Sequence, residues 1–263
     1  MKIIEFFGLP MSRKSYFVNL IFNHRKKNNF SNYRNIIVDF MYKQKKISFF
    51  EFVYWRYINL KRDKKFKKRN NYTNLNKKNL ISDLKKKISF FLPSYQDFLK
   101  KFDNYFKNYS GDNNRLIDFV INLSNKYQID ISEVLYWIKL DILGFELNKR
   151  YSNKILVNSE GFFQRCLSIL FRLQNINNDE IQKLINLCPT IDIVYVILNR
   201  NIPKKKLIQY IRIKNNNFKF NREFIKNFFF IIKCLKKKKI KVKIIYNYKK
   251  NNKEIVNDIL KDF

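Results

Sequence analysis

The feature that most constrains this chain is a short apolar run near its start that ends in a glycine. Residues Ile3 to Phe7 are apolar apart from Glu5, and Gly8 follows them directly. A continuous run of this length is typical of a strand buried on both faces of a parallel sheet. Because the 263 residues include only four glycines and four prolines, the turn Gly8-Leu9-Pro10 is an informative signal. The sequence therefore predicts a central parallel strand, a tight loop, and then a helix over Ser15 to Asn23.

The loop after this strand has the spacing of a phosphate-binding (Walker A) loop, with one replacement. Such a loop contains Gly, four residues, a second Gly, Lys, and then Ser or Thr. Gly8, Lys14 and Ser15 keep that spacing, while Arg13 stands where the second glycine belongs. In a loop of this kind, backbone N–H groups at a helix N-terminus face the phosphates. The lysine binds the β- and γ-phosphates, and the hydroxyl binds Mg²⁺.

Two interpretations of these loop residues stay open. A glycine at the position of Arg13 allows φ > 0 and close backbone approach, whereas an L-residue in that conformation costs roughly 1–2 kcal/mol. Arg13 therefore either bends the loop and crowds the phosphates, or contacts a phosphate with its own charge. Lys14 and Ser15 are either phosphate and metal ligands or an ordinary lysine and hydroxyl in the first turn of a helix.

The chain is strongly basic, with 55 Lys and Arg residues against 21 Asp and Glu and a formal net charge of +34. A field of this strength attracts nucleic acid or an anionic membrane. The lysines are spread along the whole sequence, and Lys, Asn, Ile, Phe and Tyr dominate it as they do in the products of AT-rich genomes. Coding bias therefore explains the charge without a partner, and a basic RNA-binding protein is the alternative function from another class.

The cysteines and the apolar segments indicate the compartment. Cys166, Cys188 and Cys234 are far apart and form no C-x-x-C pair, as expected of buried thiols in a reducing compartment. His24 is the single histidine, so no histidine-based zinc site is predicted. We expect no transmembrane segment, because no apolar run reaches 18 residues. Glu5 interrupts the apolar start and no cleavage pattern follows, which argues against a signal peptide. A cytoplasmic protein is predicted.

The rest of the chain alternates apolar runs with helical patterns, which predicts an α/β fold with a parallel sheet of about five strands. Further strands are expected at Ile191 to Leu198, Val242 to Tyr246 and Ile155 to Asn158, with Ile36 to Phe40 as a possible fifth. Helices are expected over Pro93 to Tyr109, Leu116 to Tyr127, Ser132 to Lys149 and Asn252 to Leu260. We expect one domain over 1–263, in which 43–150 is a largely helical insertion and Lys61 to Asn76 is a mobile loop.

The order of these features resembles the P-loop nucleoside-monophosphate kinases, of the thymidylate-kinase and adenylate-kinase sort, whose sheet is part of a three-layer P-loop NTPase fold. Their first strand often continues into Gly-x-Pro-Gly-Ser-Gly-Lys-Ser. The matching residues here are Glu5, Gly8, Pro10, Ser12, Lys14 and Ser15, whereas Met11 and Arg13 replace glycines. A later strand in some relatives ends in Asp-Glu-Gly before an apolar pair and a basic helix. Ile155 to Arg165 is similar, with Ser159 in place of the aspartate.

The resemblance implies an ATP-binding, kinase-like protein that uses Mg²⁺ and transfers a phosphoryl group to a nucleotide or another small metabolite. It implies that Lys14 and Glu160 are catalytic, Glu160 by organising Mg²⁺ or the acceptor hydroxyl, and that Ser15 binds the metal. The nucleotide would be held by Gly8, Ser12, Arg13, Lys14, Ser15 and, from a lid helix that also carries Lys204 to Lys206, by Arg212. Acceptor contacts would lie within 43–150.

Two alternatives apply to this implied function. Met11, Arg13 and Ser159 depart from the family pattern at chemical positions, so a degenerate member that no longer catalyses transfer is the nearest alternative. Glu160 has a second interpretation as an exposed carboxylate at a helix start, where the helix dipole favours negative charge.

Overall fold

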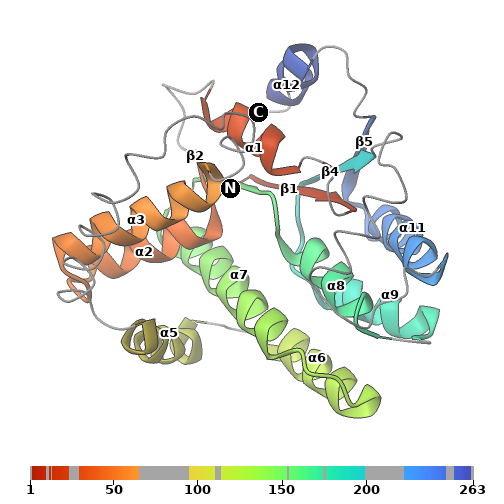
Figure 1. The fold of residues 1–263 in the computed structure, drawn as a ribbon, viewed down its shortest axis with the longest axis horizontal. Helices are drawn as coiled ribbons and strands as arrows, with labels where there is room; N and C mark the ends of the chain where they lie inside the picture. The colour runs from red at the N-terminus through yellow and green to blue at the C-terminus, as the bar shows by residue number, and fades with distance from the viewer. Residues whose placement is uncertain are drawn as a thin grey trace, which may run out of the picture.

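The sheet of the computed structural model contains five parallel strands, with the first strand in the middle (Figure 1). The structure describes residues 2–9, 12, 14–23, 30–64, 95–109, 114–152, 154–173, 176–198, 222–246 and 252–261. In the order β2-β3-β1-β4-β5, the strands are Phe30–Ser31, Ile155–Asn158, Ile3–Gly8, Ile193–Leu198 and Lys241–Tyr246. The predicted α/β class, the parallel sheet and the central position of the first strand are confirmed.

Ten helices pack around this sheet within the described ranges. They are α1 (Lys14–Asn23), α2 (Tyr33–Lys43), α3 (Phe49–Lys64), α5 (Tyr95–Tyr109), α6 (Asn114–Tyr127), α7 (Ser132–Tyr151), α8 (Phe162–Leu170), α9 (Asn178–Leu187), α11 (Arg222–Lys237) and α12 (Asn252–Leu260). The described residues between 43 and 150 are thus helices and short connections. Lys61 to Lys64, predicted as the start of a loop, continue α3, and the rest of that predicted loop lies outside the described residues.

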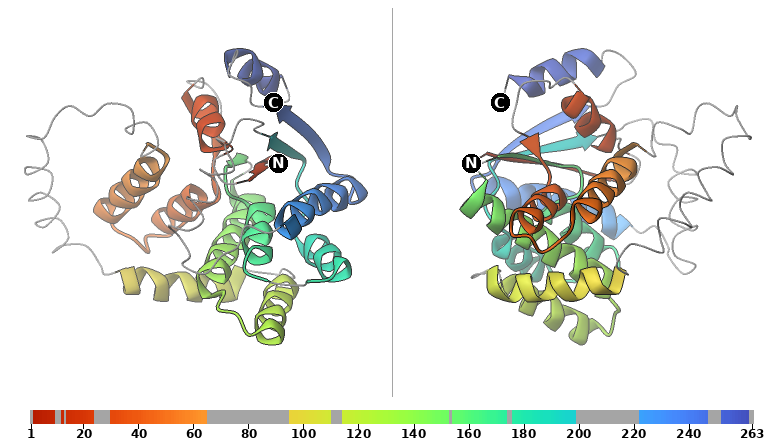
Figure 2. Two further views of the ribbon diagram at one scale, coloured as in Figure 1. Left: turned by 45° about the vertical axis from the view of Figure 1, so that its right-hand side comes forward. Right: turned by 90° about the vertical axis from the view of Figure 1, so that its left-hand side faces the viewer.

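The alternation of side chains along β1 divides the core into two layers. Ile4 and Phe6 belong to a small cluster with residues of α1 and α12, whereas Ile3 and Phe7 belong to a large one with residues of α2, α7, α8, α9 and α11. Figure 2 shows α1 and α12 on one side of the sheet and α7, α8, α9 and α11 on the other. Because β1 is buried on both faces, its sequence is nearly continuous in apolar residues.

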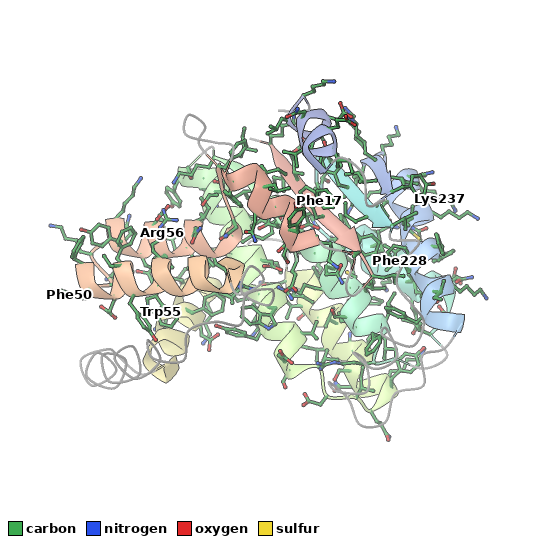
Figure 3. The ribbon with its side chains drawn as sticks, turned by 45° about the horizontal axis from the view of Figure 1, so that its top comes forward. Phe17, Phe50, Trp55, Arg56, Phe228 and Lys237 are labelled. Atoms are coloured by element: carbon green, nitrogen blue, oxygen red, sulfur yellow. The ribbon has the colours of Figure 1, made fainter. Side chains whose placement is uncertain are left out.

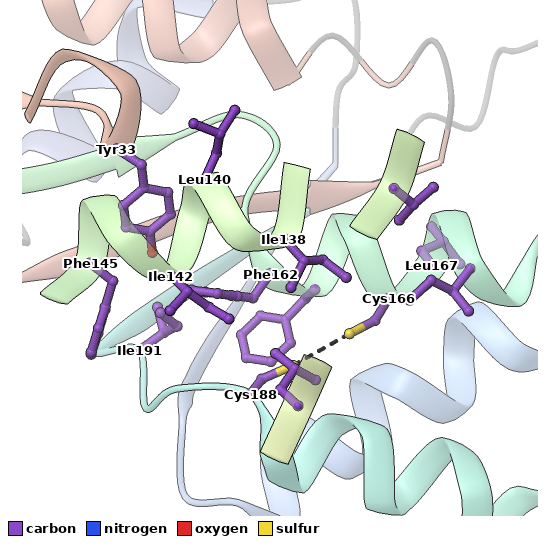
Figure 4. Packing of buried hydrophobic residues seen from close by; sticks show 14 of the residues in the cluster. Tyr33, Ile138, Leu140, Ile142, Phe145, Phe162, Cys166, Leu167, Cys188 and Ile191 are labelled. Carbon is purple, nitrogen blue, oxygen red and sulfur yellow. Dashed lines mark hydrogen bonds between the residues drawn. The ribbon is translucent and has the colours of Figure 1, made fainter. Parts of the chain in front are cut away.

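The large cluster also contains two cysteines that are distant in the sequence. The Sγ atoms of Cys166 on α8 and Cys188 after α9 lie 3.3 Å apart among apolar side chains (Figure 4). Both are free thiols, and Cys234 on α11 is buried as well. Burial raises the pKa of Cys234, whereas the hydrogen bond with Cys188 and then burial raise the pKa of Cys166. The predicted burial of all three cysteines is confirmed.

The strand suggested at Ile36 to Phe40 is wrong, because these residues lie inside α2. Its β-branched residues favoured a strand, but the buried Tyr33, Ile36, Ile37, Phe40 and Met41 form a stripe at helical spacing. Asn32 begins the helix by accepting a hydrogen bond from the Asn35 N–H at 2.9 Å. The fifth strand is instead β2, only two residues long and paired with Ile155 and Leu156 of β3. A strand this short carries no periodic pattern.

Close packing of α2 on α7 depends on Gly144. A Cβ atom built on this residue would lie 2.6 Å from the Cβ and from the carbonyl oxygen of Tyr33, the first residue of α2. Tyr33 is almost fully buried and its backbone cannot move easily. The glycine is therefore required by contact between two helices, although glycine disfavours helix formation.

Gly144→Ala is expected to destabilise the protein by about 1–3 kcal/mol, because overpacking outweighs the gain in helix propensity. Thermal unfolding is the measurement, and the melting temperature should fall by about 2–4 °C per kcal/mol in a chain of this size. Asn122→Ala, on the exposed face of α6, is the control for helix propensity alone and should leave the melting temperature unchanged or higher. A stabilised Gly144→Ala variant would contradict the close approach.

Candidate functional site

The neighbouring strands β1 and β3 are parallel, with Glu5 in register with Asn158, the last residue of β3, so that β1 continues to Gly8 beyond the end of β3. The chain leaves β1 through α1, which packs on one face of the sheet, and leaves β3 through α8, which packs on the other. Ligands of open α/β sheets bind where neighbouring strands connect to opposite faces in this way. The loops after Gly8 and after Asn158 are therefore the candidate site.

Gly8 permits the first of these loops to fold back against the sheet. A Cβ atom on Gly8 would lie 2.6 Å from Oγ of Ser12 and 2.8 Å from the carbonyl oxygen of Ile197 on β4. Ser12 is buried, and its backbone N–H donates to the carbonyl of Leu9 at 3.1 Å. The structure thus brings together Gly8 and Ser12, two of the residues predicted to hold a nucleotide, by direct contact.

Lys14 is half-buried at the start of α1 and its ammonium group lies within the loop. Its Nζ donates to the carbonyl oxygens of Gly8 at 2.8 Å and Leu9 at 3.2 Å, and to Oγ of Ser12 at 3.4 Å. Burial lowers the pKa of Lys14 to about 8, and the negative charge of Glu160 partly opposes this change. Ser15 follows in the same turn and is also half-buried. Arg13 and Arg212 lie outside the described residues.

Glu160 precedes α8 and reaches the same edge of the sheet. Its side chain is 53% exposed, and one of its carboxylate oxygens lies 3.3 Å from Nη1 of Arg165. The negative charge of Glu160 also acts on the pKa of Lys14, the other side chain predicted to be catalytic. Glu160 stands just before α8, as expected of a carboxylate at a helix start.

Arg165 is held on its other side by a buried carboxylate. Its Nε lies 3.2 Å from Oδ2 of Asp141 on α7, and its guanidinium lies 5.4 Å from the ring centre of Trp137. Arg34 stacks on the same ring at 4.3 Å. Burial raises the pKa of Asp141 to about 6, against the opposite effect of the two arginines. Within the described part of the chain, Nη2 of Arg165 and Nδ2 of Asn158 are buried donors without an acceptor.

Glu5 is the residue of this region whose role sequence reasoning missed. It matches the kinase motif that the start of the chain resembles, but the sequence predicts no role for its carboxylate. The side chain is buried and accepts hydrogen bonds from the backbone N–H groups of Phe162 at 2.9 Å and Phe163 at 3.3 Å. The hydroxyl of Tyr33 donates to it at 3.2 Å. The available signal was a charged residue inside a strand buried on both faces, since such residues are seldom buried unless they are paired.

Through these bonds Glu5 caps α8 from another element. The N-cap residue Gly161 has no side chain to accept the first N–H groups of the helix, and the Glu5 carboxylate accepts them instead. A Cβ atom on Gly161 would overlap that carboxylate. Burial raises the pKa of Glu5 to about 7, while the hydrogen bonds from Phe162, Phe163 and Tyr33 act in the opposite direction.

The chemistry of this site cannot be assigned from a group of metal ligands or from a matching protein family. Among the residues with described positions, no three His, Cys, Asp or Glu side chains gather closely enough to hold a metal ion. A search of protein-family models and of curated proteins finds no match to this sequence. No helix in the described ranges is both long and apolar enough to cross a membrane.

Glu5→Gln is expected to change how stability depends on pH. A carboxyl whose pKa is raised on folding binds its proton more tightly in the native state, so its contribution to stability falls as the pH rises from about 4.5 to about 7. Between pH 5 and pH 8, the wild type should lose on the order of 2 kcal/mol of unfolding free energy relative to the variant. Urea unfolding of both proteins at the two pH values measures this difference.

Asp118→Asn, which neutralises an exposed carboxylate on α6, is the matched control and should leave the pH dependence of the wild type unchanged. An equal difference between wild type and Glu5→Gln at both pH values would contradict the raised pKa of Glu5.

Proposed function

We propose that this protein binds ATP with Mg²⁺ in the loop after β1 and transfers the γ-phosphoryl group to a nucleotide or another small hydroxylated metabolite. The observation that supports this most directly is the position of the Lys14 ammonium inside that loop, on the carbonyls of Gly8 and Leu9. These are neutral acceptors. Phosphate oxygens would bind the same ammonium through stronger, charge-assisted hydrogen bonds.

The residues of the loop suit the chemistry of phosphate binding. The N-terminus of α1 presents backbone N–H groups and a positive dipole end next to Lys14. The Ser15 hydroxyl would contribute one oxygen ligand to Mg²⁺, whose other ligands would be phosphate oxygens and waters. Bound Mg²⁺ neutralises phosphate charge, while Lys14 fixes the position of the phosphates. Phosphoryl transfer depends mainly on such positioning and charge neutralisation.

The loop after β3 carries the carboxylate that would contact the acceptor molecule. Glu160 is exposed there, and its ion pair with Arg165 holds its carboxylate toward the sheet edge. A carboxylate in this position would orient the acceptor hydroxyl and receive its proton.

ATP with Mg²⁺ is expected to raise the melting temperature, and Lys14→Ala should abolish the increase. Ligand at 100 times its dissociation constant stabilises by about 2.7 kcal/mol, which corresponds to roughly 5–10 °C in a chain of this size. Lys149→Ala removes an exposed lysine from α7 and should retain the full increase. Arg13→Gly should bind more tightly if Arg13 crowds the phosphates and more weakly if it is a ligand.

The same measurement separates the alternatives. If neither the wild type nor Arg13→Gly responds to millimolar ATP at modest salt, the proposed nucleotide site is wrong. A stabilised protein that shows no transfer to any acceptor would be the degenerate, binding-only form. Binding of RNA in place of nucleotide would weaken steeply as salt increases and would not need Mg²⁺.

The affinity for ATP should also depend on pH through Lys14. Burial lowers the pKa of Lys14 to about 8. Above that pH, most molecules carry Lys14 as a neutral amine, which must take up a proton before it binds phosphate as an ammonium. The dissociation constant should therefore rise about tenfold between pH 7 and pH 9. Calorimetric titrations at pH 8.5, in buffers of different ionisation enthalpy, should reveal proton uptake. An affinity independent of pH, without proton uptake, would contradict a lowered pKa of Lys14, and loss of ATP binding in Lys14→Ala would still test its contact with the phosphates.

A further inference from the structure

The connection between α2 and α3 carries exposed aromatic side chains. We call residues 42–53 the α2–α3 tip. In it, Phe50 is 79% exposed, Phe49 59%, Val53 47% and Tyr42 38%. Figure 3 shows Phe50 at the outer end of the α2–α3 pair, away from the sheet. Single exposed apolar residues are ordinary, but several large ones gathered in one turn mark an interaction site.

The fold fixes this tip without burying those side chains. Ser48 and Glu51 form a capping box, in which the Ser48 N–H donates to the Glu51 carboxylate at 2.7 Å and the Glu51 N–H donates to the Ser48 hydroxyl at 3.2 Å. Met41 and Ile47 supply the buried side of the turn. Phe49 and Phe50 begin α3 on its exposed side, so their outward position is built into the start of the helix.

Lysines surround these aromatics. Lys43, Lys45 and Lys46 are exposed, and together with Tyr42, Ile47 and Ser48 they line a shallow hollow in the turn. The carboxylate of the tip is that of Glu51, which takes part in the capping box. The tip therefore presents apolar rings together with positive charge, at one end of a helix pair.

We propose that the α2–α3 tip docks on the surface of an anionic lipid bilayer. Phe49 and Phe50 would enter the boundary between headgroups and acyl chains, and the three lysines would contact anionic headgroups. The ring of Tyr42 already stacks on Phe52, with centroids 4.4 Å apart, and Val53 has no aromatic face. These features suit insertion into lipid better than stacking of nucleic-acid bases, which needs open ring faces along a groove. This inference is independent of the proposed nucleotide site.

The test is sedimentation of the full chain with vesicles of phosphatidylcholine alone and of phosphatidylcholine with 40% phosphatidylserine. We expect binding to the anionic vesicles and little to the neutral ones. The double variant Phe49→Ser with Phe50→Ser should bind at least about tenfold more weakly, because it loses the buried apolar area. Phe229→Ser, which alters an exposed phenylalanine on α11, is the matched control and should bind like the wild type.

The net charge of +34 makes a second control necessary, since any basic protein adsorbs to anionic vesicles. Changing Lys43, Lys45 and Lys46 to Gln should weaken binding by about fivefold for each lysine. The same change at the exposed Lys236, Lys237 and Lys239 should have a much smaller effect. Equal losses from both sets, or unchanged binding of the double phenylalanine variant, would show adsorption by net charge and overturn the proposal.

A third outcome would also overturn it. If the tip variants bind vesicles normally but lose affinity for a single-stranded RNA probe, the tip is an RNA-binding surface.

Phe50→Trp offers a direct readout of insertion into the bilayer, because an indole that enters the bilayer should shift its emission to shorter wavelength and be quenched by brominated lipid. No such change with anionic vesicles would contradict insertion.

Discussion

The arrangement of the candidate site depends on the hydrogen bonds that the Glu5 carboxylate accepts. One side chain from the central strand accepts the first N–H groups of α8 and the hydroxyl of Tyr33 at the start of α2. It thereby joins β1 to the helices that follow β2 and β3. Gly161 belongs to the same junction, because any larger residue would occupy the space of the carboxylate. A buried charge is costly unless it is hydrogen-bonded, and these bonds offset part of that cost, although burial still raises the pKa of Glu5 to about 7.

This junction sets the spacing between the two loops of the site. Because α8 begins where Glu5 holds it, Gln164 and Arg165 have fixed positions in the first turn of that helix. The Gln164 side chain accepts a hydrogen bond from the Gly8 N–H at 3.3 Å, and Arg165 binds Glu160 and Asp141. Contacts from α8 therefore reach both the end of β1 and the loop after β3. The pKa values of Glu5 and Asp141 are raised mainly because both carboxyl groups are buried in this arrangement.

Sequence reasoning predicted the sheet better than the site. The strands β1, β3, β4 and β5 were found within two residues, because buried parallel strands are continuous apolar runs. Ile36 to Phe40 has the same composition but belongs to a helix, and only its spacing and the Asn32 cap distinguish it. Gly8, Lys14 and Ser15 follow from the loop spacing, and Ser12 follows from the resemblance to the kinase motif. The partners of Arg165 could not be predicted, because Asp141, Trp137 and Arg34 come from distant segments that only the packing of α2, α7 and α8 brings together.

The three carboxylates of the site differ in what they can do chemically. Glu5 and Asp141 are buried and engaged, the first with helix N–H groups and the second with Arg165. Glu160 differs from both because its side chain is about half exposed, and an acceptor hydroxyl can approach it from solvent. The Asp-Glu-Gly motif of the kinases that this segment resembles has an aspartate at the position of Ser159, next to Glu160. In the proposed phosphoryl transfer, Glu160 is therefore the carboxylate of these three that would contact the acceptor, and its ion pair with Arg165 would orient it.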